Sequence, residues 1–228
     1  MPTEYFEQRE RALLGQRYEQ LYAAPQQTAE RGVTVSALRT TPEQFAQRAD
    51  FPLEPSPFCK AAFVVHQPDF KPGRHPYHHA GVFYSQEPSA SSAAPLLGVQ
   101  PGMRVLDLCA APGGKTILLA EQMQGTGELY SCDAAENRVG LIRTAVDRMG
   151  FTGVHTLCND ATKPNPALPM ADRILTDVPC SGLGILAKKP DLRYKKLEAA
   201  RQAELLATQA AILDTAAALL KAGGRLVY

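Results

Sequence analysis

The stretch from Val105 to Thr116, VLDLCAAPGGKT, places a glycine-containing turn between an apolar strand pattern and the start of a helix. Such a turn lets backbone amides approach a ligand closely. The stretch lacks the earlier glycine of the phosphate-binding motif G-x-x-x-x-G-K-[ST], and it does not match the dinucleotide fingerprint G-x-G-x-x-G. A ligand site of another kind is therefore predicted here, with phosphate binding as the weaker interpretation.

Three aspartates follow predicted strands. Asp133 lies twenty residues beyond Gly113, and Asp160 and Asp177 follow the next two strand patterns. In an open α/β sheet all three would gather at the carboxyl edge, where an acidic side chain accepts hydrogen bonds from ribose hydroxyls. A nucleoside-containing cofactor fits this pattern, although any one of the three could simply cap a helix.

The segment TDVPCSGLG, Thr176 to Gly184, brings a carboxylate, a proline and a thiol to the same edge. Carbon 5 of cytosine is unreactive until a nucleophile adds at carbon 6, and the Cys180 thiolate could add there. Asp177 could hydrogen-bond the ring nitrogen of the base and favour that addition. The alternative for Cys180 is a buried structural thiol.

A basic run with Tyr194 interleaved follows this segment, and its candidates for contact with RNA phosphates are Lys188, Lys189, Arg193 and Lys195. Such runs are also common on solvated helix surfaces. His75, His78 and His79 have no cysteine or carboxylate near them at ligand spacing, so we expect no metal there. We expect a non-helical loop over Lys71–Ala80 that crosses between domains.

These residues need a framework to position them. From Gly102 onward the sequence alternates strand, turn and helix, which predicts a Rossmann-like, doubly wound α/β sheet. A long helix over about 196–221, with Gly223-Gly224 as its cap, leads to a last strand. Residues 1–85 are predicted to form a small α+β domain, with helices over 4–21 and 42–48 and a strand over 33–38, and residues 86–228 the cofactor domain.

Composition is that of an ordinary globular protein, with 45% hydrophobic residues, 21% charged residues and a formal charge of +1. Five cysteines without C-x-x-C spacing indicate reduced thiols in the cytoplasm. The amino terminus has no signal pattern, and nowhere do 18 apolar residues run together. We expect a cytoplasmic monomer with no membrane contact.

Taken together, LDLCAAPGGKT, Asp133, TDVPCSGLG, the helix with Gln209 and Leu213, and KAGGRLVY resemble the NOL1/NOP2/Sun family of RNA (cytosine-C5)-methyltransferases. The segment PGRHPYHHAGVFYSQEPSA, Pro72 to Ala90, is similar to the bacterial branch that modifies 16S ribosomal RNA. One departure is Thr34-Val35-Ser36, where the family tends to have an arginine-valine-asparagine run.

The resemblance implies S-adenosylmethionine as the cofactor and 16S ribosomal RNA, or the small ribosomal subunit, as the partner. It implies that the cofactor is surrounded by Cys109, Ala110, Ala111, Pro112, Gly113, Gly114, Lys115, Asp133, Asp160 and Asp177, and Arg138 is expected to help indirectly. It also implies that the attacking thiolate follows the fifth strand, beyond Tyr228, and that Cys180 assists release of the covalent adduct. On the residues alone Cys180 would be the nucleophile, and we follow the family.

The expectation is therefore a chain truncated within its sheet, which binds cofactor but does not turn over alone. One alternative is an amino-directed or small-molecule methyltransferase, which would need no thiol. Another is a non-catalytic RNA-binding assembly factor with a vestigial pocket. The target nucleotide does not follow from the sequence.

Overall fold

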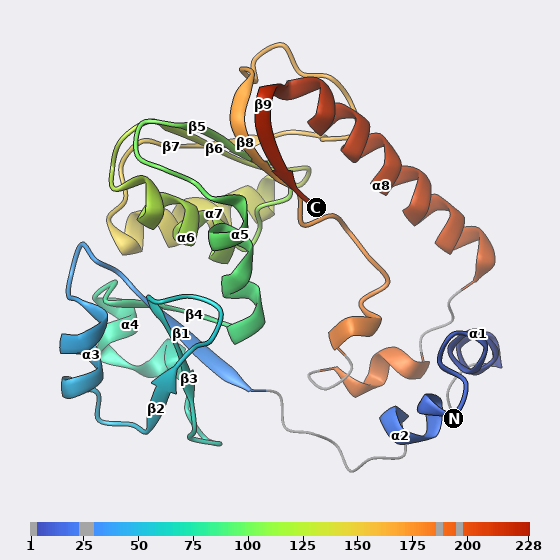
Figure 1. Ribbon diagram of the computed structural model, residues 1–228, viewed down its shortest axis with the longest axis horizontal. Coiled ribbons are helices and arrows are strands. Elements are labelled where there is room, and N and C mark those ends of the chain that lie inside the picture. Colours follow the sequence, from blue (N-terminus) through green and yellow to red (C-terminus); the bar gives the residue numbers. More distant parts are fainter. Residues whose placement is uncertain (1–3, 23–29, 186–188, 195–197) are drawn as a thin grey trace. The chain divides into compact units, whose positions relative to one another are not determined.

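The computed structural model describes residues 4–22, 30–185, 189–194 and 198–228 (Figure 1). It divides into two compact units. The larger comprises residues 30–178 and 211–228, and the smaller comprises residues 1–29 and 179–210. The predicted domain boundary near residue 85 stays a prediction.

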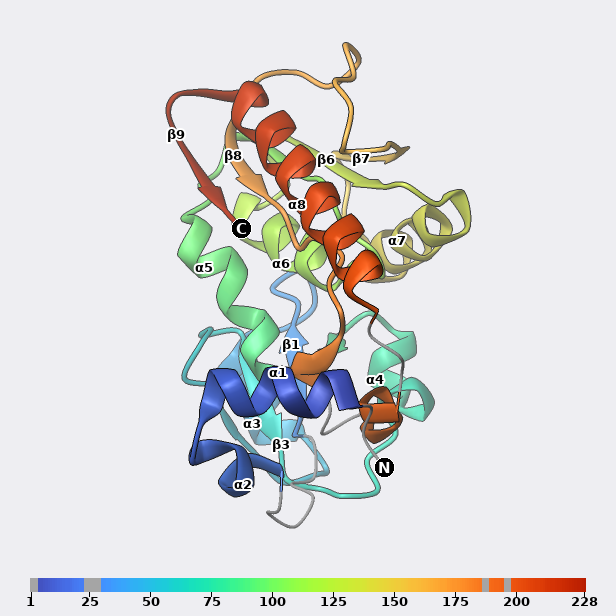
Figure 2. The same ribbon diagram turned by 90° about the vertical axis from the view of Figure 1, so that its right-hand side faces the viewer.

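A five-stranded parallel sheet forms the centre of the larger unit, with strand order β7-β6-β5-β8-β9. The strands are β5 (Arg104–Asp107), β6 (Glu128–Asp133), β7 (Val154–Cys158), β8 (Ala171–Leu175) and β9 (Leu220–Val227). Figure 2 shows the carboxyl end of α8 (Ala199–Leu219) leading into β9 beside β8. The predicted α/β fold with a parallel sheet is confirmed.

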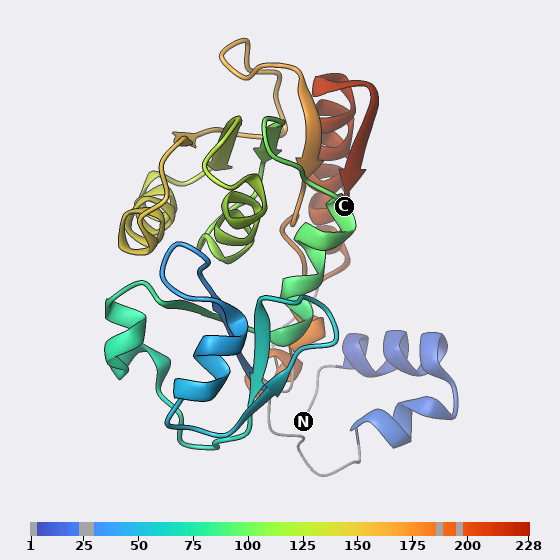
Figure 3. The ribbon, with the colours of Figure 1, turned by 60° about the vertical axis from the view of Figure 1, so that its left-hand side comes forward.

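Helices cover both faces of this sheet. Side chains alternate between the two faces of a strand, so each strand contributes apolar side chains to both cores. On one face, Val105, Leu129 and Leu175 pack against α5 (Ala93–Leu97), α6 (Gly114–Met123) and α7 (Glu136–Met149). Figure 3 shows α6 and α7 on the same side of the strands. On the other face, Leu106 and Ile174 pack against Ile212 and Ala216 of α8.

A four-stranded antiparallel sheet precedes the parallel one, in the order β2-β3-β1-β4. Its strands are β1 (Arg31–Val35), β2 (Leu53–Pro55), β3 (Ala62–Val65) and β4 (Phe83–Gln86). The predicted helix Pro42–Arg48 is α3, and its first turn is capped by the Thr41 side chain, which accepts from the Gln44 amide. Phe45 of this helix packs in an aromatic core with Phe51, Phe63, Phe70 and Phe83.

The smaller unit contains α1 (Glu4–Leu14), α2 (Arg17–Tyr22), the 3-10 helices η3 (Leu183–Ile185) and η4 (Pro190–Tyr194), and the first half of α8. The single helix predicted for 4–21 is divided at Gly15, which adopts a φ of 54°. Within the described ranges, no helix is long and apolar enough to cross a membrane.

Two further local predictions were wrong. The segment Lys71–Ala80 contains η1 (Pro72–Arg74) and α4 (Pro76–His79), because each proline stands at a first helical position, where proline is tolerated. Gly223 and Gly224 lie inside β9 and do not cap α8.

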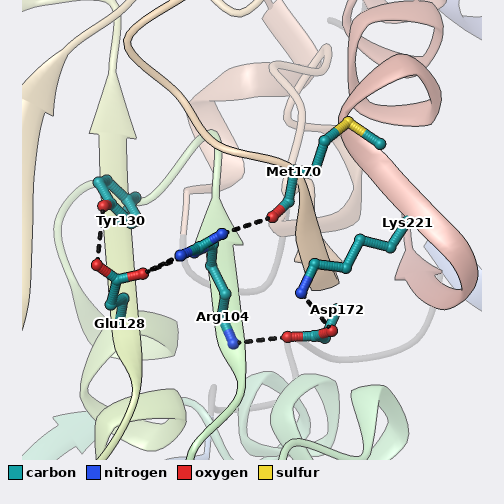
Figure 4. Close-up of polar contacts among 6 residues, drawn as sticks. All are labelled: Arg104, Glu128, Tyr130, Met170, Asp172 and Lys221. Atoms are coloured by element: carbon teal, nitrogen blue, oxygen red, sulfur yellow. Dashed lines mark hydrogen bonds and ion pairs between the residues drawn. The ribbon is translucent and has the colours of Figure 1, made fainter.

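The amino edge of the parallel sheet has its own polar network (Figure 4). Arg104 Nε donates to Glu128 at 2.6 Å, and the Arg104 backbone amide donates to Asp172 at 2.8 Å. Lys221 Nζ lies 2.8 Å from the second Asp172 oxygen. Because these residues come from β6, β5, β8 and β9, the network ties four neighbouring strands together at the edge opposite the predicted site.

Candidate cofactor site at the carboxyl edge of the parallel sheet

The carboxyl ends of β5, β6 and β8 lie side by side, and the predicted cofactor residues follow them. In the parallel register, Asp107 of β5 pairs with Ser131 of β6 and with Leu175 of β8. Asp133, at the end of β6, pairs with Cys158 of β7. Asp160 and Asp177 therefore leave the sheet at the same edge as the loop that begins at Leu108.

The loop between β5 and α6, residues 108–113, is fixed by backbone hydrogen bonds. The Leu108 amide donates to the Leu175 carbonyl at 3.0 Å, and the Ala110 amide donates to the Cys132 carbonyl at 2.8 Å. Gly113 has a φ of 110°, and a Cβ there would lie 3.4 Å from both Ala145 and Ile142 of α7. The positive φ therefore favours glycine at this position, and a side chain there would contact α7.

Helix α6 begins directly after this turn without a side-chain cap. The first amides of a helix have no acceptor within the helix, and Gly113, at the cap position, has no side chain to supply one. Gly114 lies so close to β4 that a Cβ would be 3.0 Å from both Tyr84 and Gln86. The start of α6 is thus a close-approach turn whose free amides suit a carboxylate or another anion.

Asp133 and Arg138 form one bracket at the end of β6. Arg138 Nη1 lies 3.2 Å from Asp133 Oδ2, and Arg138 Nη2 donates to the Ala111 carbonyl at 3.0 Å. The Ala135 amide donates to Asp133 Oδ1 at 3.2 Å. Arg138, which was expected to help indirectly, therefore holds the carboxylate against the 108–113 loop. A carboxylate can accept about four hydrogen bonds, so Asp133 keeps acceptor capacity for a ligand hydroxyl.

Asp160 is ordered by its own loop. Its Oδ1 accepts from the Thr162 hydroxyl at 2.6 Å and from the Thr162 amide at 3.1 Å, and Lys163 Nζ lies 3.1 Å from Oδ2. These contacts, the Thr162 hydroxyl first, lower the pKa of Asp160, so it is ionised at neutral pH. The preceding residue, Asn159, donates its amide to the Asp133 carbonyl at 2.9 Å, which places the two loops side by side.

Asp177 is joined to the first turn of α6. Lys115 Nζ lies 2.7 Å from Asp177 Oδ2, and the Asp177 side chain is 57% exposed. The sequence predicted both residues for the site but not this ion pair. A partly exposed pair stabilises the fold by at most about 1 kcal/mol, so its effect is mainly to fix where the chain leaves β8.

The thiols differ in character. Burial, followed by the nearby carboxylates of Asp107, Asp133 and Asp177, raises the pKa of Cys109 to about 12, so it is a neutral packing thiol at physiological pH. Cys180 is exposed and belongs to the smaller unit. There Gln209 Nε2 of α8 donates to the Pro179 carbonyl at 2.9 Å and so holds the turn that precedes the thiol.

The other residues that the sequence predicted are those of the basic run and the histidines. Lys188 and Lys195 fall outside the described residues, Lys189 is exposed, and Arg193 stands in η4. His75 Nε2 lies 3.1 Å from Asp50, and its Nδ1 accepts from the Tyr77 amide. Among the described residues no cluster of three or more histidine, cysteine or acidic side chains could hold a metal ion.

The sequence analysis missed Asp107, the last residue of β5. Its side chain is completely buried, Oδ2 accepts from Thr116 Oγ1 at 2.8 Å, and Oδ1 has no partner within the described residues. Ser131 donates to Thr116 at 3.0 Å, so the three side chains link β5, α6 and β6. Burial raises the pKa of Asp107 to about 7. The available signal was an aspartate within the apolar run VLDLC.

Comparisons with known proteins agree with this geometry. Residues 94–228 match the family model "16S rRNA methyltransferase RsmB/F", and residues 1–88 match the "N-terminal domain of 16S rRNA methyltransferase RsmF". The chain belongs to the RsmB/F family of 16S rRNA methyltransferases. This confirms the resemblance to the Sun family, whose members are S-adenosylmethionine-dependent methyltransferases.

Two named relatives show how much of a family member this chain covers. The chain is 32% identical over 222 residues to ribosomal RNA small subunit methyltransferase F of Escherichia coli O157:H7, covering 92% of this chain and 46% of that protein. It is 42% identical over 150 residues to a probable ribosomal RNA small subunit methyltransferase B of Synechocystis, covering 65% of this chain and 33% of that protein. The chain thus spans half or less of the length of these relatives.

A solved structure supports the fold. The crystal structure of a methyltransferase homologue from Pyrococcus horikoshii is 28% identical and superimposes with a TM-score of 0.84. The match covers 99% of this chain and 72% of that one. The arrangement of an antiparallel sheet before a Rossmann-like methyltransferase sheet is therefore shared with a solved member of the methyltransferase class.

Proposed function

We propose that this RsmB/F-family protein takes part in transferring a methyl group from S-adenosylmethionine to carbon 5 of a cytosine in 16S ribosomal RNA. The observation that most supports the proposal is the ion pair between Lys115 and Asp177. It joins the helix that starts the predicted cofactor loop to the carboxylate that leads into the D-x-P-C segment. The proposed cofactor loop and Asp177, the residue proposed to contact the base, are therefore in direct contact.

The residues at this edge fit S-adenosylmethionine. Asp133 keeps acceptor capacity for ribose hydroxyls, and the free amides at the start of α6 suit the carboxylate of the methionine part. Asp160, which follows β7 at the same edge, offers a further carboxylate near Asp133 for a nucleoside. The cofactor would supply an electrophilic methyl group. Cys109 to Lys115, Asp133, Arg138, Asp160 and Asp177 are proposed as its site.

The chemistry of the base is assigned to Asp177 and Cys180. Asp177 is exposed, so it can reach a flipped base and hydrogen-bond its ring nitrogen while a thiolate adds at carbon 6. In the Sun family the attacking thiolate follows the fifth strand and the D-x-P-C cysteine assists breakdown of the adduct. On that analogy we assign release of the covalent adduct to Cys180.

The RNA partner is proposed to lie against the basic run after Cys180. Lys189 is exposed, and Lys188, Arg193 and Lys195 are its neighbours in sequence. Lysine and arginine side chains bind phosphates without reading sequence, so the run would position RNA but would not select the nucleotide. Ribosomal RNA, free or within the small subunit, is the proposed partner.

Deletion of the gene in its own host tests the proposed function. The 16S ribosomal RNA of the deletion strain should lose 5-methylcytosine at one position, as measured by mass spectrometry of nuclease fragments. The intact gene should restore it, a Cys180→Ser gene should not, and a gene with Cys158→Ser, at another exposed thiol, should restore it fully. An unchanged 5-methylcytosine content in the deletion strain would refute the proposal.

A further inference from the structure

A large cavity lies in the larger unit, away from the cofactor loop. Its volume is about 860 Å³, and it is bounded by α3, the loop between β2 and β3, α5 and the end of α6. Gln122, on its wall, is eight residues after Gly114, or about 12 Å along the helix axis. The volume falls within the range typical of small-ligand pockets.

The walls of this α3–α6 cavity are mainly apolar. Phe58, in the loop between β2 and β3, is 46% exposed. The apolar wall consists chiefly of Pro42, Ala46, Phe58, Phe63, Pro95 and Leu118. Such a surface favours a ligand with an apolar body, because contact removes apolar area from water.

Glu121 of α6 supplies a carboxylate to this cavity. Its Oε1 accepts from the Ala37 amide at 2.6 Å and its Oε2 from Ser36 Oγ at 3.3 Å, so both bonded donors are neutral. No lysine, arginine or histidine of the described ranges forms an ion pair with it. Burial raises the pKa of Glu121, as expected for a partly desolvated carboxylate without a counter-charge.

Gln122 lies beside Glu121 on the cavity wall, and its buried Oε1 has no hydrogen-bond donor in the described part of the chain. Glu43 also lines the cavity, and Lys60 is the one basic side chain in the lining that the structure describes. Among the charged side chains of the lining, carboxylates therefore outnumber basic groups.

We propose that the α3–α6 cavity binds a ligand that carries a primary ammonium or guanidinium group on an apolar body. The cationic group donates to Glu121, and the apolar body packs against Phe58, Pro95 and Leu118. A free amine and a lysine or arginine side chain of a peptide share this chemistry. The proposal is independent of methyl transfer, since the cavity is formed without the cofactor edge.

Calorimetric titration with four probes tests this proposal. The cationic probes are 2-phenylethylamine and N-acetyl-leucyl-arginine amide, and their neutral counterparts are 2-phenylethanol and N-acetyl-leucyl-glutamine amide. At least one cation should bind about tenfold or more tightly than its counterpart, because a hydrogen bond to a charged group is stronger than a neutral one. Glu121→Gln, which keeps an acceptor for the Ala37 amide, should remove that difference.

Two further variants complete the design. Asp147→Asn, at an exposed carboxylate of α7 outside the cavity, should bind the cation as the natural protein does. Ala46→Trp should fill the cavity and abolish binding of every probe, with an unchanged circular dichroism spectrum showing that the fold persists. Binding of both cations supports the free amine as sufficient, and binding of the dipeptide alone supports a peptide source. Absence of cation binding, equal binding of the neutral probes, or full binding by Glu121→Gln would overturn the proposal.

Discussion

Replacement of the buried carboxylate Asp107 by asparagine should stabilise the protein increasingly as the pH rises. Burial raises the pKa of Asp107 to about 7, against 3.8 for an unperturbed aspartate. The folded protein therefore retains a proton between about pH 4 and pH 7 that the unfolded chain releases. The contribution of this group to the free energy of unfolding is full below pH 4 and is lost as the pH rises through 7.

The magnitude follows from the two pKa values. Linkage predicts that ionisation of Asp107 lowers the free energy of unfolding by about 2–3 kcal/mol between pH 5 and pH 8. Asparagine cannot ionise, yet it has nearly the same shape and still offers an oxygen to the Thr116 hydroxyl. Any fixed cost of the amide shifts the difference between the two proteins equally at every pH. The diagnostic quantity is therefore the change of that difference with pH.

Urea denaturation followed by circular dichroism at pH 5, 6, 7 and 8 measures this quantity. The Asp107→Asn protein should gain about 2–3 kcal/mol relative to the natural protein across that range. Asp147→Asn, at an exposed carboxylate, serves as the control and should show a constant difference. A constant difference for Asp107→Asn, or one that falls as the pH rises, would refute the assignment of Asp107 as a buried, easily protonated acid.

Three other substitutions or treatments have defined expectations. Gly113→Ala forces a side chain to a φ of 110° and into contact with α7, so it should lower the free energy of unfolding by about 1–3 kcal/mol, whereas Gly73→Ala, with open space around it, should change it little. Asp172→Asn weakens the bonds to Lys221 and to the Arg104 amide and should destabilise the protein by about 1 kcal/mol at pH 7, as measured by denaturation; an unchanged midpoint would contradict that role. Iodoacetamide at pH 8 should alkylate Cys158 and Cys180, which are exposed, much faster than Cys109, whose pKa is raised to about 12; equal rates by mass spectrometry would contradict the burial of Cys109.

The parallel sheet could be predicted from the sequence because its signals are local. The run ELYSCD became β6, and α6 begins at Gly114 as the glycine turn suggested. Alternation of strand and helix also required the aspartates after the strands to share one edge. What failed was the interpretation of proline and glycine, since Pro76 begins a short helix and Gly223 lies within a strand.

The site could be predicted less completely because its contacts join distant residues. The ion pair of Lys115 with Asp177 spans 62 positions, and no periodicity relates them. The α3–α6 cavity is assembled from residues between Pro42 and Gln122, so it depends on how β2, β3 and α6 pack. Burial of Asp107 likewise depends on its neighbours, although a charged residue within an apolar strand pattern is a signal worth testing.

The most direct test of the central claim is a calorimetric titration of the 228-residue chain with S-adenosylmethionine. The natural chain should bind one equivalent. Asp133→Ala should weaken binding about tenfold or more, because it removes the carboxylate proposed to accept from the ribose, and Asp147→Asn should bind normally. No binding by the natural chain, or equal binding by Asp133→Ala, would contradict the assignment of the cofactor to the carboxyl edge of the parallel sheet.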